Sequence, residues 1–514
     1  MSSSHDLNDP HSGESEEAAM LGADEAEEEI MDLEGDTAMD SGSDEEDDGE
    51  GQEGDDEIME EIQLQNDSAA HFDFHPDSIF TIAQHPTNTN IVATGGSEGD
   101  DKGGIGYIWD STPDSTNTPV LPASYQTAPN EQPVERKSLE PIFKLEGHTD
   151  SINALAFTLP KGEFLFSGGL DGKLRAYVSN PNGSKWKHIA EVQEVEEINW
   201  MIPCPNPSSP NTIALGANDG SVWVYTVDAT NKSAPLVILQ SYFLHTSSCT
   251  AGSWSADGKL LATVSEDESL YVWDVFGEGA AAGLTQGEGG AYVVGLTSLD
   301  QRFAVEGGLF SVAISPAGNF VVVGGAGGNI KVIGLPRLSS DTPNPAAKTS
   351  RNKAVTGKIN ASAGQSGQIL ADLKAQGDGI ETLAFSAPPL TLLAAGSVDG
   401  SIALFDSAHR WAVRRHIKEA HEEYSVVKVD FVKNPSGSAN GGWLLTSCGM
   451  DGVVRRWDTR GGTGMANSGF VKEWKGHRGE GEGGGVLGFV QGDGGRIITA
   501  GDDGVALVFD APVA

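Results

Sequence analysis

Cysteine and long apolar runs are scarce in this chain. Three cysteines, Cys204, Cys249 and Cys448, are too few for a disulfide framework in 514 residues, which favours a reducing, intracellular compartment. No run of about 18 apolar residues occurs, and residues 1–10 lack the basic and apolar regions of a signal peptide. The sequence therefore predicts no membrane span and a cytoplasmic location, with a nuclear fraction left open.

Motifs of catalysis are also missing. The chain has no Gly-x-Ser-x-Gly elbow on a strand–helix turn and no helical His-Glu-x-x-His. The Gly-rich segment 479–485 lacks the Gly-Lys-Ser/Thr of a phosphate-binding loop, and its glutamates repel phosphate. Residues 103–106 read as a hairpin feature rather than a dinucleotide fingerprint. We expect no enzymatic activity, no cofactor and no metal site.

Basic residues are absent from the N-terminal segment. Residues 1–61 contain 26 Asp and Glu but no Lys or Arg, so the formal net charge of −43 leaves −17 for the remainder of the chain. Such a surface repels nucleic acid and anionic membranes and attracts basic proteins. Residues 1–68 bury too little apolar area to fold, and we expect a disordered acidic tail. Its charge run fits three roles, namely solvation, auxiliary binding of basic clients, or competition with a basic ligand.

A repeated phrase organises the rest of the sequence. An apolar stretch, small residues and an Asp-Gly pair are followed by a second apolar stretch that often ends in an aromatic residue. Each copy predicts a β-hairpin with the Asp-Gly pair in its turn. Neighbouring copies are spaced by 48 residues from Asp171 to Asp219 and by 52 from Asp451 to Asp503, which predicts an array of small sheets. The copies are residues 166–177, 214–223, 394–405, 445–457 and 498–509.

Eight repeats fit between residue 72 and the last residues. Three insertions, 111–138, 277–301 and 336–366, have the composition of surface loops. With Gly-His at 147–148 and 476–477 and Trp-Asp at 109–110, 273–274 and 457–458, the pattern resembles the WD-repeat family. The resemblance implies an all-β, eight-bladed WD-repeat β-propeller over residues 69–514. A strand near 69–75 is expected to complete the last blade and close the ring.

The turn aspartates and the Gly-His histidines are best interpreted as structural. Asp stabilises tight turns through local hydrogen bonds, and in the family such residues form a network with Ser or Thr and Trp. The two histidines lie too far apart in the ring to share a metal. The resemblance assigns the following residues to turns and networks: His148, Asp171, Asp219, Asp267, Asp399, Asp451, His477 and Asp503.

A second set of acids is a candidate binding site. In WD-repeat propellers, the loop that enters the innermost strand of each blade and the residue before the turn Asp face one end of the channel, where peptides bind. We expect acids from several blades to converge there and focus a negative potential, although each one alone reads as an ordinary solvated charge. Trp200 and Tyr424 are candidates for stacking on arginine, with a core role equally open for Trp200. The candidate peptide-binding acids are Asp150, Glu196, Glu197, Glu266, Glu306, Asp378, Glu381, Glu422, Glu423 and Asp502.

Within the WD-repeat family, residues 196–201, 215–223, 380–385 and 393–405, together with the acidic leader, resemble the angio-associated migratory cell protein group. The yeast-type members of that group are dedicated chaperones of a large-subunit ribosomal protein, L-ten. The resemblance implies a monomeric escort that binds the basic N-terminal segment of L-ten and delivers L-ten for 60S assembly. The hypothesis extends to binding of the client as a nascent chain. Two other classes stay open: a nuclear histone-binding or glutamate-rich WD-repeat assembly factor, and an adaptor of a ubiquitin ligase or signalling complex.

Overall fold

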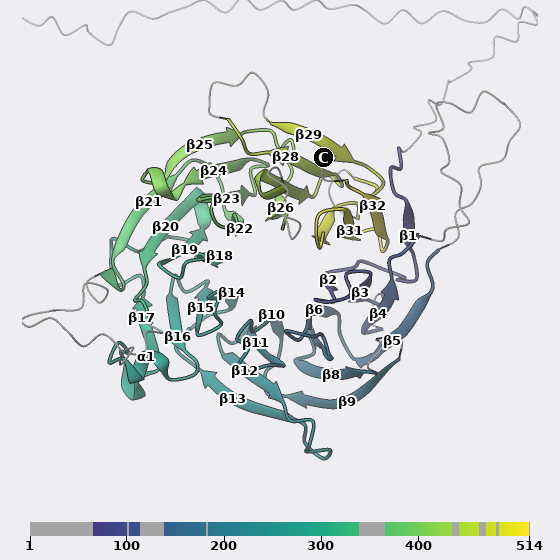
Figure 1. The fold of residues 1–514 in the computed structure, drawn as a ribbon, viewed down its shortest axis with the longest axis horizontal. Helices are drawn as coiled ribbons and strands as arrows, with labels where there is room; N and C mark the ends of the chain where they lie inside the picture. Colours follow the sequence, from purple (N-terminus) through teal and green to yellow (C-terminus); the bar gives the residue numbers. More distant parts are fainter. Residues whose placement is uncertain are drawn as a thin grey trace, which may run out of the picture. The chain divides into compact units, whose positions relative to one another are not determined.

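Eight four-stranded antiparallel sheets stand around a central channel (Figure 1). Seven of the sheets are meanders of four consecutive strands with the first of the four innermost. In the eighth sheet, three consecutive strands are joined by β1, which comes first in the chain and lies outermost. The prediction of an eight-bladed all-β propeller is confirmed. The computed structural model describes residues 65–99, 102–113, 138–180, 183, 185–338, 365–433, 441–461, 469–479 and 483–512. The expected acidic tail up to residue 64 and most of the insertions at 111–138 and 336–366 lie outside these residues.

The first four blades follow one another along the chain. Blade 1 contains β2 (Thr81–Gln84), β3 (Ile91–Ser97), β4 (Gly104–Asp110) and β5 (Pro141–His148). Blade 2 contains β6 (Ile152–Phe157), β7 (Phe164–Gly169), β8 (Lys173–Ser179) and β9 (Trp186–Gln193). Blade 3 contains β10 (Ile198–Pro203), β11 (Thr212–Ala217), β12 (Val222–Val227) and β13 (Leu236–Tyr242). Blade 4 contains β14 (Cys249–Trp254), β15 (Leu260–Ser265), β16 (Leu270–Asp274) and β17 (Tyr292–Leu296).

The second half of the ring repeats the same plan. Blade 5 contains β18 (Leu309–Ile314), β19 (Phe320–Gly325), β20 (Asn329–Gly334) and β21 (Ile369–Lys374). Blade 6 contains β22 (Ile380–Phe385), β23 (Leu392–Ser397), β24 (Ile402–Asp406) and β25 (Ala412–Ile417). Blade 7 contains β26 (Val426–Phe431), β27 (Leu444–Gly449), β28 (Val454–Asp458) and β29 (Phe470–Trp474). Blade 8 contains β30 (Val486–Val490), β31 (Arg496–Gly501), β32 (Ala506–Asp510) and β1 (Ala70–Phe72).

Helical structure is confined to single turns in the connections. These turns are α1 (Glu278–Ala281), η2 (Glu288–Gly290), η3 (Ala326–Gly328), η5 (Ser407–His409) and η6 (Gly441–Trp443). The insertion expected as a surface loop at 277–301 is partly different: after α1 and η2 it supplies β17, the outer strand of blade 4. Its glycines hid this strand from sequence reasoning.

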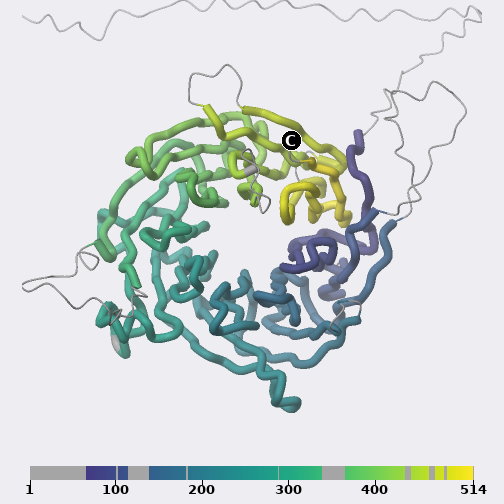
Figure 2. Tube along the Cα trace, viewed as in Figure 1, coloured from purple at the N-terminus to yellow at the C-terminus, as the bar shows by residue number. Residues whose placement is uncertain are grey.

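The ring closes between the two ends of the described chain. β1 pairs antiparallel with β32, with Ala70 opposite Val508 and Phe72 opposite Ala506, and Figure 2 shows the purple and yellow segments side by side. The ring of Phe72 is fully buried and stacks on Trp109 of blade 1 at 4.8 Å. The backbone N–H of Asp67 also donates to Lys475 O at 2.8 Å. Gln65 also lines a pocket with Tyr424, so the described contacts with the propeller begin inside the segment that the sequence assigned to the tail.

The apolar core lies between neighbouring blades. One cluster joins Leu215 of blade 3 to Phe166 of blade 2, and another joins Val264 of blade 4 to Val323 of blade 5. Side chains alternate between the two faces of a sheet. Each blade therefore turns one apolar face toward the blade before it and the other toward the blade after it. Every blade is therefore held by both of its neighbours, and the hairpin loops at either end of the ring are left to face solvent.

Candidate functional site: the acidic end of the channel

Loops at the two ends of the channel have different origins. Because each blade is an antiparallel meander, the second-to-third-strand turns and the connections between blades emerge at one end, and all other loops emerge at the opposite end. Backbone hydrogen bonds tie the first two kinds of loop together in all eight blades. The bonds run from Ser97 N to Ser78 O, Leu170 N to Ser151 O, Asn218 N to Glu197 O, Glu266 N to Ser248 O, Ala326 N to Gly308 O, Val398 N to Gly379 O, Met450 N to Ser425 O and Asp502 N to Gly485 O.

Charge is divided unequally between these two ends. In the described loops at the end just defined, 22 residues are Asp or Glu and five are Lys or Arg. In the described loops at the opposite end, seven are acidic and eight are basic. We call the first end the acidic end. All ten candidate peptide-binding acids belong to it, nine in loops and Glu381 as the second residue of β22. The asymmetry supports their common location, and their role stays a prediction.

Three acids at the acidic end share one local geometry. The Asp150 and Asp378 carboxylates accept hydrogen bonds from the next backbone N–H at 2.6 and 2.7 Å. Asp77 of blade 1 does the same at 2.8 Å, and sequence reasoning missed it. The signal was present, because Asp77-Ser78-Ile79 repeats Asp150-Ser151-Ile152. In each case one carboxylate oxygen caps the loop, and the side chain is held at the entry to the innermost strand.

The remaining predicted acids of the interblade loops face solvent. Glu196, Glu306, Glu422 and Glu423 are exposed and Glu197 is half-buried. They come from the connections that enter blades 3, 5 and 7. Glu422 has a φ of 55°, a left-handed conformation that is uncommon for a residue with a side chain. The five carboxylates are thus spread over three separate blades and not gathered into one cluster.

The two predicted pre-turn acids are engaged by their own loops. The Glu266 carboxylate accepts a hydrogen bond from Ser247 Oγ at 3.2 Å. The Asp502 carboxylate accepts from Ser78 Oγ at 2.7 Å and from Gly483 N at 2.6 Å. Because Ser78 precedes blade 1, Asp502 links the last blade to the first. Asp502 is thus partly occupied by a structural role.

Among the candidate acids, Glu381 and Asp378 come closest to forming an electrostatically coupled pair. Partial burial raises the pKa of the Glu381 carboxyl, and the negative charge of Asp378 raises it further. An uncompensated carboxylate beside another favours a cation that neutralises both. This part of the acidic end is therefore suited to a lysine or arginine side chain.

The turns between the second and third strands are not uniformly acidic. At the positions equivalent to Glu266 and Asp502, three other blades carry Leu170, Val398 and Met450, all half-buried. Only the acids at this position were predicted from the sequence to face a ligand. The mouth of the channel therefore combines carboxylates with apolar side chains, so a ligand held there contacts both.

The turn aspartates are bound by side chains and backbone groups of their own blade and of the segment that leads into it. His148 Nδ1 lies 3.0 Å from Asp171 Oδ1, and His148 Nε2 lies 2.8 Å from Ser167 Oγ. His477 makes the same contacts with Asp503 and Thr499 at 3.0 and 2.8 Å. Burial alone would raise the pKa of Asp171, but hydrogen bonds from His148 and the Thr149 N–H outweigh it and lower the pKa to about 2. Asp219 and Asp399 cap their turns through Ser221 and Ser401.

Three further histidines complete networks that the sequence did not reveal: His75, which shares Thr94 Oγ1 with Trp109 Nε1 in blade 1, and two that lie in networks with a turn Asp. His421 Nδ1 lies 2.9 Å from Asp451 Oδ1, and its Nε2 shares Ser447 Oγ with Trp457 Nε1. His245 Nε2 similarly shares Thr263 Oγ1 with Trp273 Nε1 in the blade that holds Asp267. Both histidines lack a preceding glycine, so the Gly-His pattern could not find them. Their spacing before the turn Asp is the signal that remained.

The two aromatic candidates have different environments. Trp200 Nε1 donates to Cys249 O of blade 4 at 3.1 Å. A Cβ atom on Gly216 or Gly252 would lie 2.4 or 2.2 Å from its ring. Trp200 therefore fills the space between blades 3 and 4, in the structural role that was left open. Tyr424 lines a pocket of about 330 Å³ at the acidic end, together with Glu422 and Arg455.

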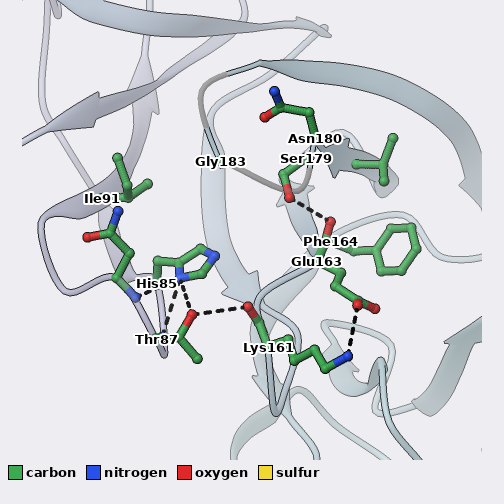
Figure 3. A pocket seen from close by; sticks show the side chains of 11 residues that line it. His85, Thr87, Ile91, Lys161, Glu163, Phe164, Ser179, Asn180 and Gly183 are labelled. Carbon is green, nitrogen blue, oxygen red and sulfur yellow. Dashed lines mark hydrogen bonds and ion pairs between the residues drawn. The ribbon is translucent and has the colours of Figure 1, made fainter.

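The cavities at the opposite end are of another kind. Figure 3 shows one of about 510 Å³ between blades 1 and 2, where His85 and Thr87 face Lys161. His85 Nδ1 accepts from the Asn88 N–H at 3.1 Å, so its hydrogen-bonding capacity is used in the loop. A second cavity of about 760 Å³ contains Lys428 and Lys433 and lies at the ends of the innermost strands. Neither cavity contains a candidate acid.

The described residues contain neither a cluster of metal ligands nor a membrane-spanning helix. Within that part of the chain, no three His, Cys, Asp or Glu side chains are grouped as metal ligands. In the same residues, no helix has the length and apolar character needed to cross a membrane.

Comparison with known proteins identifies the family. The profile described as "WD domain, G-beta repeat" matches residues 139–177, 237–274, 301–333 and 415–458. The crystal structure of Chaetomium thermophilum Sqt1 bound to the N-terminus of ribosomal protein L10 is 57% identical, with a TM-score of 0.74, over 87% of this chain and 100% of that one. This chain belongs to the Sqt1 family of WD-repeat propellers. The resemblance stated from sequence is confirmed.

Two curated relatives extend the comparison. The ribosome assembly protein SQT1 of Saccharomyces cerevisiae is 28% identical over 89% of this chain and 90% of its own length. The angio-associated migratory cell protein of Homo sapiens is 22% identical over 88% of this chain and 82% of its own length. Both matches cover more than four fifths of this chain.

Proposed function

We propose that this protein is a non-enzymatic chaperone that binds the basic N-terminal segment of the large-subunit ribosomal protein L10 at the acidic end and escorts it to 60S assembly. The observation that carries the proposal is the Sqt1–L10 complex, whose Sqt1 chain is 57% identical and fully covered. The excess of 22 acids over five bases at the acidic end supplies the matching charge.

The chemistry of such a client explains the need for an escort. Ribosomal proteins that bind rRNA are rich in Lys and Arg, and before assembly these cations attract any available nucleic acid. Carboxylates that receive charge-assisted hydrogen bonds from Arg and Lys shield the cations and accelerate encounter. Phosphates of rRNA compete for the same cations, which gives a route to release.

The proposal is tested by charge reversal at the acidic end. We expect Glu197→Lys, Glu381→Lys and Glu423→Lys, combined, to weaken binding of an L10 N-terminal peptide more than a hundredfold, because three attractions become three repulsions. Isothermal titration calorimetry measures the affinity, and circular dichroism reports folding. Unchanged affinity in a folded triple variant contradicts the proposal.

The opposite end provides a matched control. Glu163, Glu278 and Asp493 are exposed acids of its loops. Their combined reversal to Lys changes the net charge by the same amount and should alter affinity less than threefold, because screening weakens distant charges. Equal losses in both triple variants would point to net charge and not to the acidic end.

Affinity purification from cells separates this function from the two alternatives. One stoichiometric ribosomal protein is the expected partner in mass spectrometry. Recovery of the histones, or of a ubiquitin-ligase or signalling subunit, in its place would contradict the proposed function.

A further inference from the structure

One interblade connection at the acidic end differs from the others. Of the eight connections, only residues 243–248, between blades 3 and 4, contain no Asp, Glu, Lys or Arg. The Phe243 side chain there is 64% exposed and Leu244 is 43% exposed. An exposed phenylalanine beside a second exposed apolar residue is the kind of surface that proteins use for contact. The ring of charge is therefore interrupted at one place by an apolar opening.

The neighbouring strands of blade 3 extend this apolar surface. In blades 2, 5 and 7 the third strand carries a base that pairs with an acid on the fourth strand. Blade 3 has Trp223 opposite Ser241 at the corresponding position. The rings of Trp223 and Phe243 meet edge to face, with centroids 5.6 Å apart. The base–acid pairs are Arg175–Glu191, Lys331–Asp372 and Arg455–Glu473.

The outer edge of the blade continues in the same character. Tyr225, two residues beyond Trp223, pairs with Ile238 on β13, and the Ile238 side chain is 43% exposed. Alternation along β12 places Trp223 and Tyr225 on the same face, and their rings stack at 6.3 Å. We call Trp223, Ile238, Phe243 and Leu244 the apolar strip. It begins at the acidic end and passes down the rim of blade 3.

A second copy of this chain does not suit the strip. The formal net charge of −43 makes two copies repel each other. A client held by its N-terminus at the acidic end passes over the rim when its chain continues along the surface of the propeller. An apolar segment that crosses the rim at the uncharged connection has the smallest desolvation cost, because it removes no charged side chain from water there.

We propose that the apolar strip holds an extended, apolar segment of the same client, immediately after the basic residues bound at the acidic end. This inference rests on the proposed function and adds a second contact to it. The four strands of a blade span about 15 Å, which about five extended residues cover. The client therefore reaches the strip within a few residues of its basic segment.

Two client peptides of different length test the inference. One L10 peptide ends at the last residue of the basic N-terminal segment, and the other continues for about ten residues, enough to pass the strip. We expect the full-length protein to bind the longer peptide about tenfold more tightly, as burial of one large apolar side chain predicts. Phe243→Ser with Leu244→Ser should remove this advantage and leave the shorter peptide unaffected. Ile238→Thr should reduce the advantage in part.

Phe470 supplies the matched control. It is 47% exposed and meets Trp457 edge to face at 5.7 Å, but it starts β29 at the opposite end. Phe470→Ser should leave both affinities unchanged, and thermal melting checks that each variant is folded. Equal affinities for the two peptides, or an advantage that survives the double variant, overturn the inference alone. Binding of neither peptide overturns the proposed function and this inference together. A concentration-dependent dimer lost in the double variant assigns the strip to a second copy and overturns it as well.

Discussion

The two ends of the propeller channel are built from the same eight blades but differ in charge and in the length of their loops. At the acidic end, short connections are fixed by one repeated backbone hydrogen bond in each blade, and acids exceed bases by 22 to five. At the opposite end the charges nearly balance, and the longest connections, including 111–140 and 335–368, are found there. Insertion is tolerated where loops carry no shared geometry. The repeated backbone hydrogen bond thus accompanies the end from which the long insertions are absent.

Removing a turn aspartate at the acidic end should have the largest effect on stability. Asp451→Ala removes the acidic partner of the buried His421 and one of the two acids that pair with Arg455, and it should lower the free energy of unfolding by about 3 kcal/mol. The turn at the opposite end that Asp228 caps is exposed, and Asp228→Ala should lower the free energy of unfolding far less than Asp451→Ala. Urea denaturation measures both values. A comparable loss in the two variants would show that the ends do not differ in this respect.

Acid should weaken the propeller from the same end. Burial lowers the pKa of His75 to about 3 and also lowers that of His421. Each histidine is protonated more readily when unfolded, so its stability contribution is lost as pH falls below about 6.5. Asp171, whose pKa is about 2, adds a further loss below pH 4. We expect about 2 kcal/mol less stability at pH 5 than at pH 7.5, by denaturation at each pH. A flat profile over this range would contradict the assignment of neutral buried histidines.

Salt should distinguish the two ends in binding. Because exposed charges are screened, L10 peptide affinity should fall about tenfold between 0.1 and 1 M salt. Replacing acids of the opposite end should leave this slope unchanged, whereas neutralising Glu197 and Glu423 should flatten it. Calorimetric titration at several salt concentrations gives the slopes. Equal slopes in the two variants would show that the carboxylates of the acidic end do not cause the salt dependence of binding.

The smallest expected effect concerns Glu381. Its carboxyl pKa is raised by burial and by Asp378, so it loses its charge at a higher pH than an ordinary glutamate. Affinity for the peptide should decline about threefold from pH 7 to pH 5. Asp378→Asn should lower the Glu381 pKa and shift this decline to lower pH. Peptide affinity is measured against pH in the unsubstituted protein and in Asp378→Asn. Identical profiles would show that the Asp378 and Glu381 carboxyls do not interact.

Local sequence signals predicted the blades well because an Asp-Gly turn and two apolar strands need no distant partner. They did less well where a residue is defined by what it meets across space. His421 lies 30 residues before Asp451 and follows alanine, so no short motif marks it. β17 lies in a Gly-rich stretch and becomes a strand because β16 offers an open edge. The apolar strip was invisible because Phe243 looks in sequence like an ordinary core residue.

Closure of the ring by β1 and β32 also sets an order of events during synthesis. Ala70 meets Val508 only after the chain between them has been made, which takes on the order of 20–90 s at common rates of translation. The bond between Ser78 and Asp502 crosses the same seam. The acidic end is therefore completed only after Asp502 has been made, and an unfinished propeller has no complete surface to offer a client.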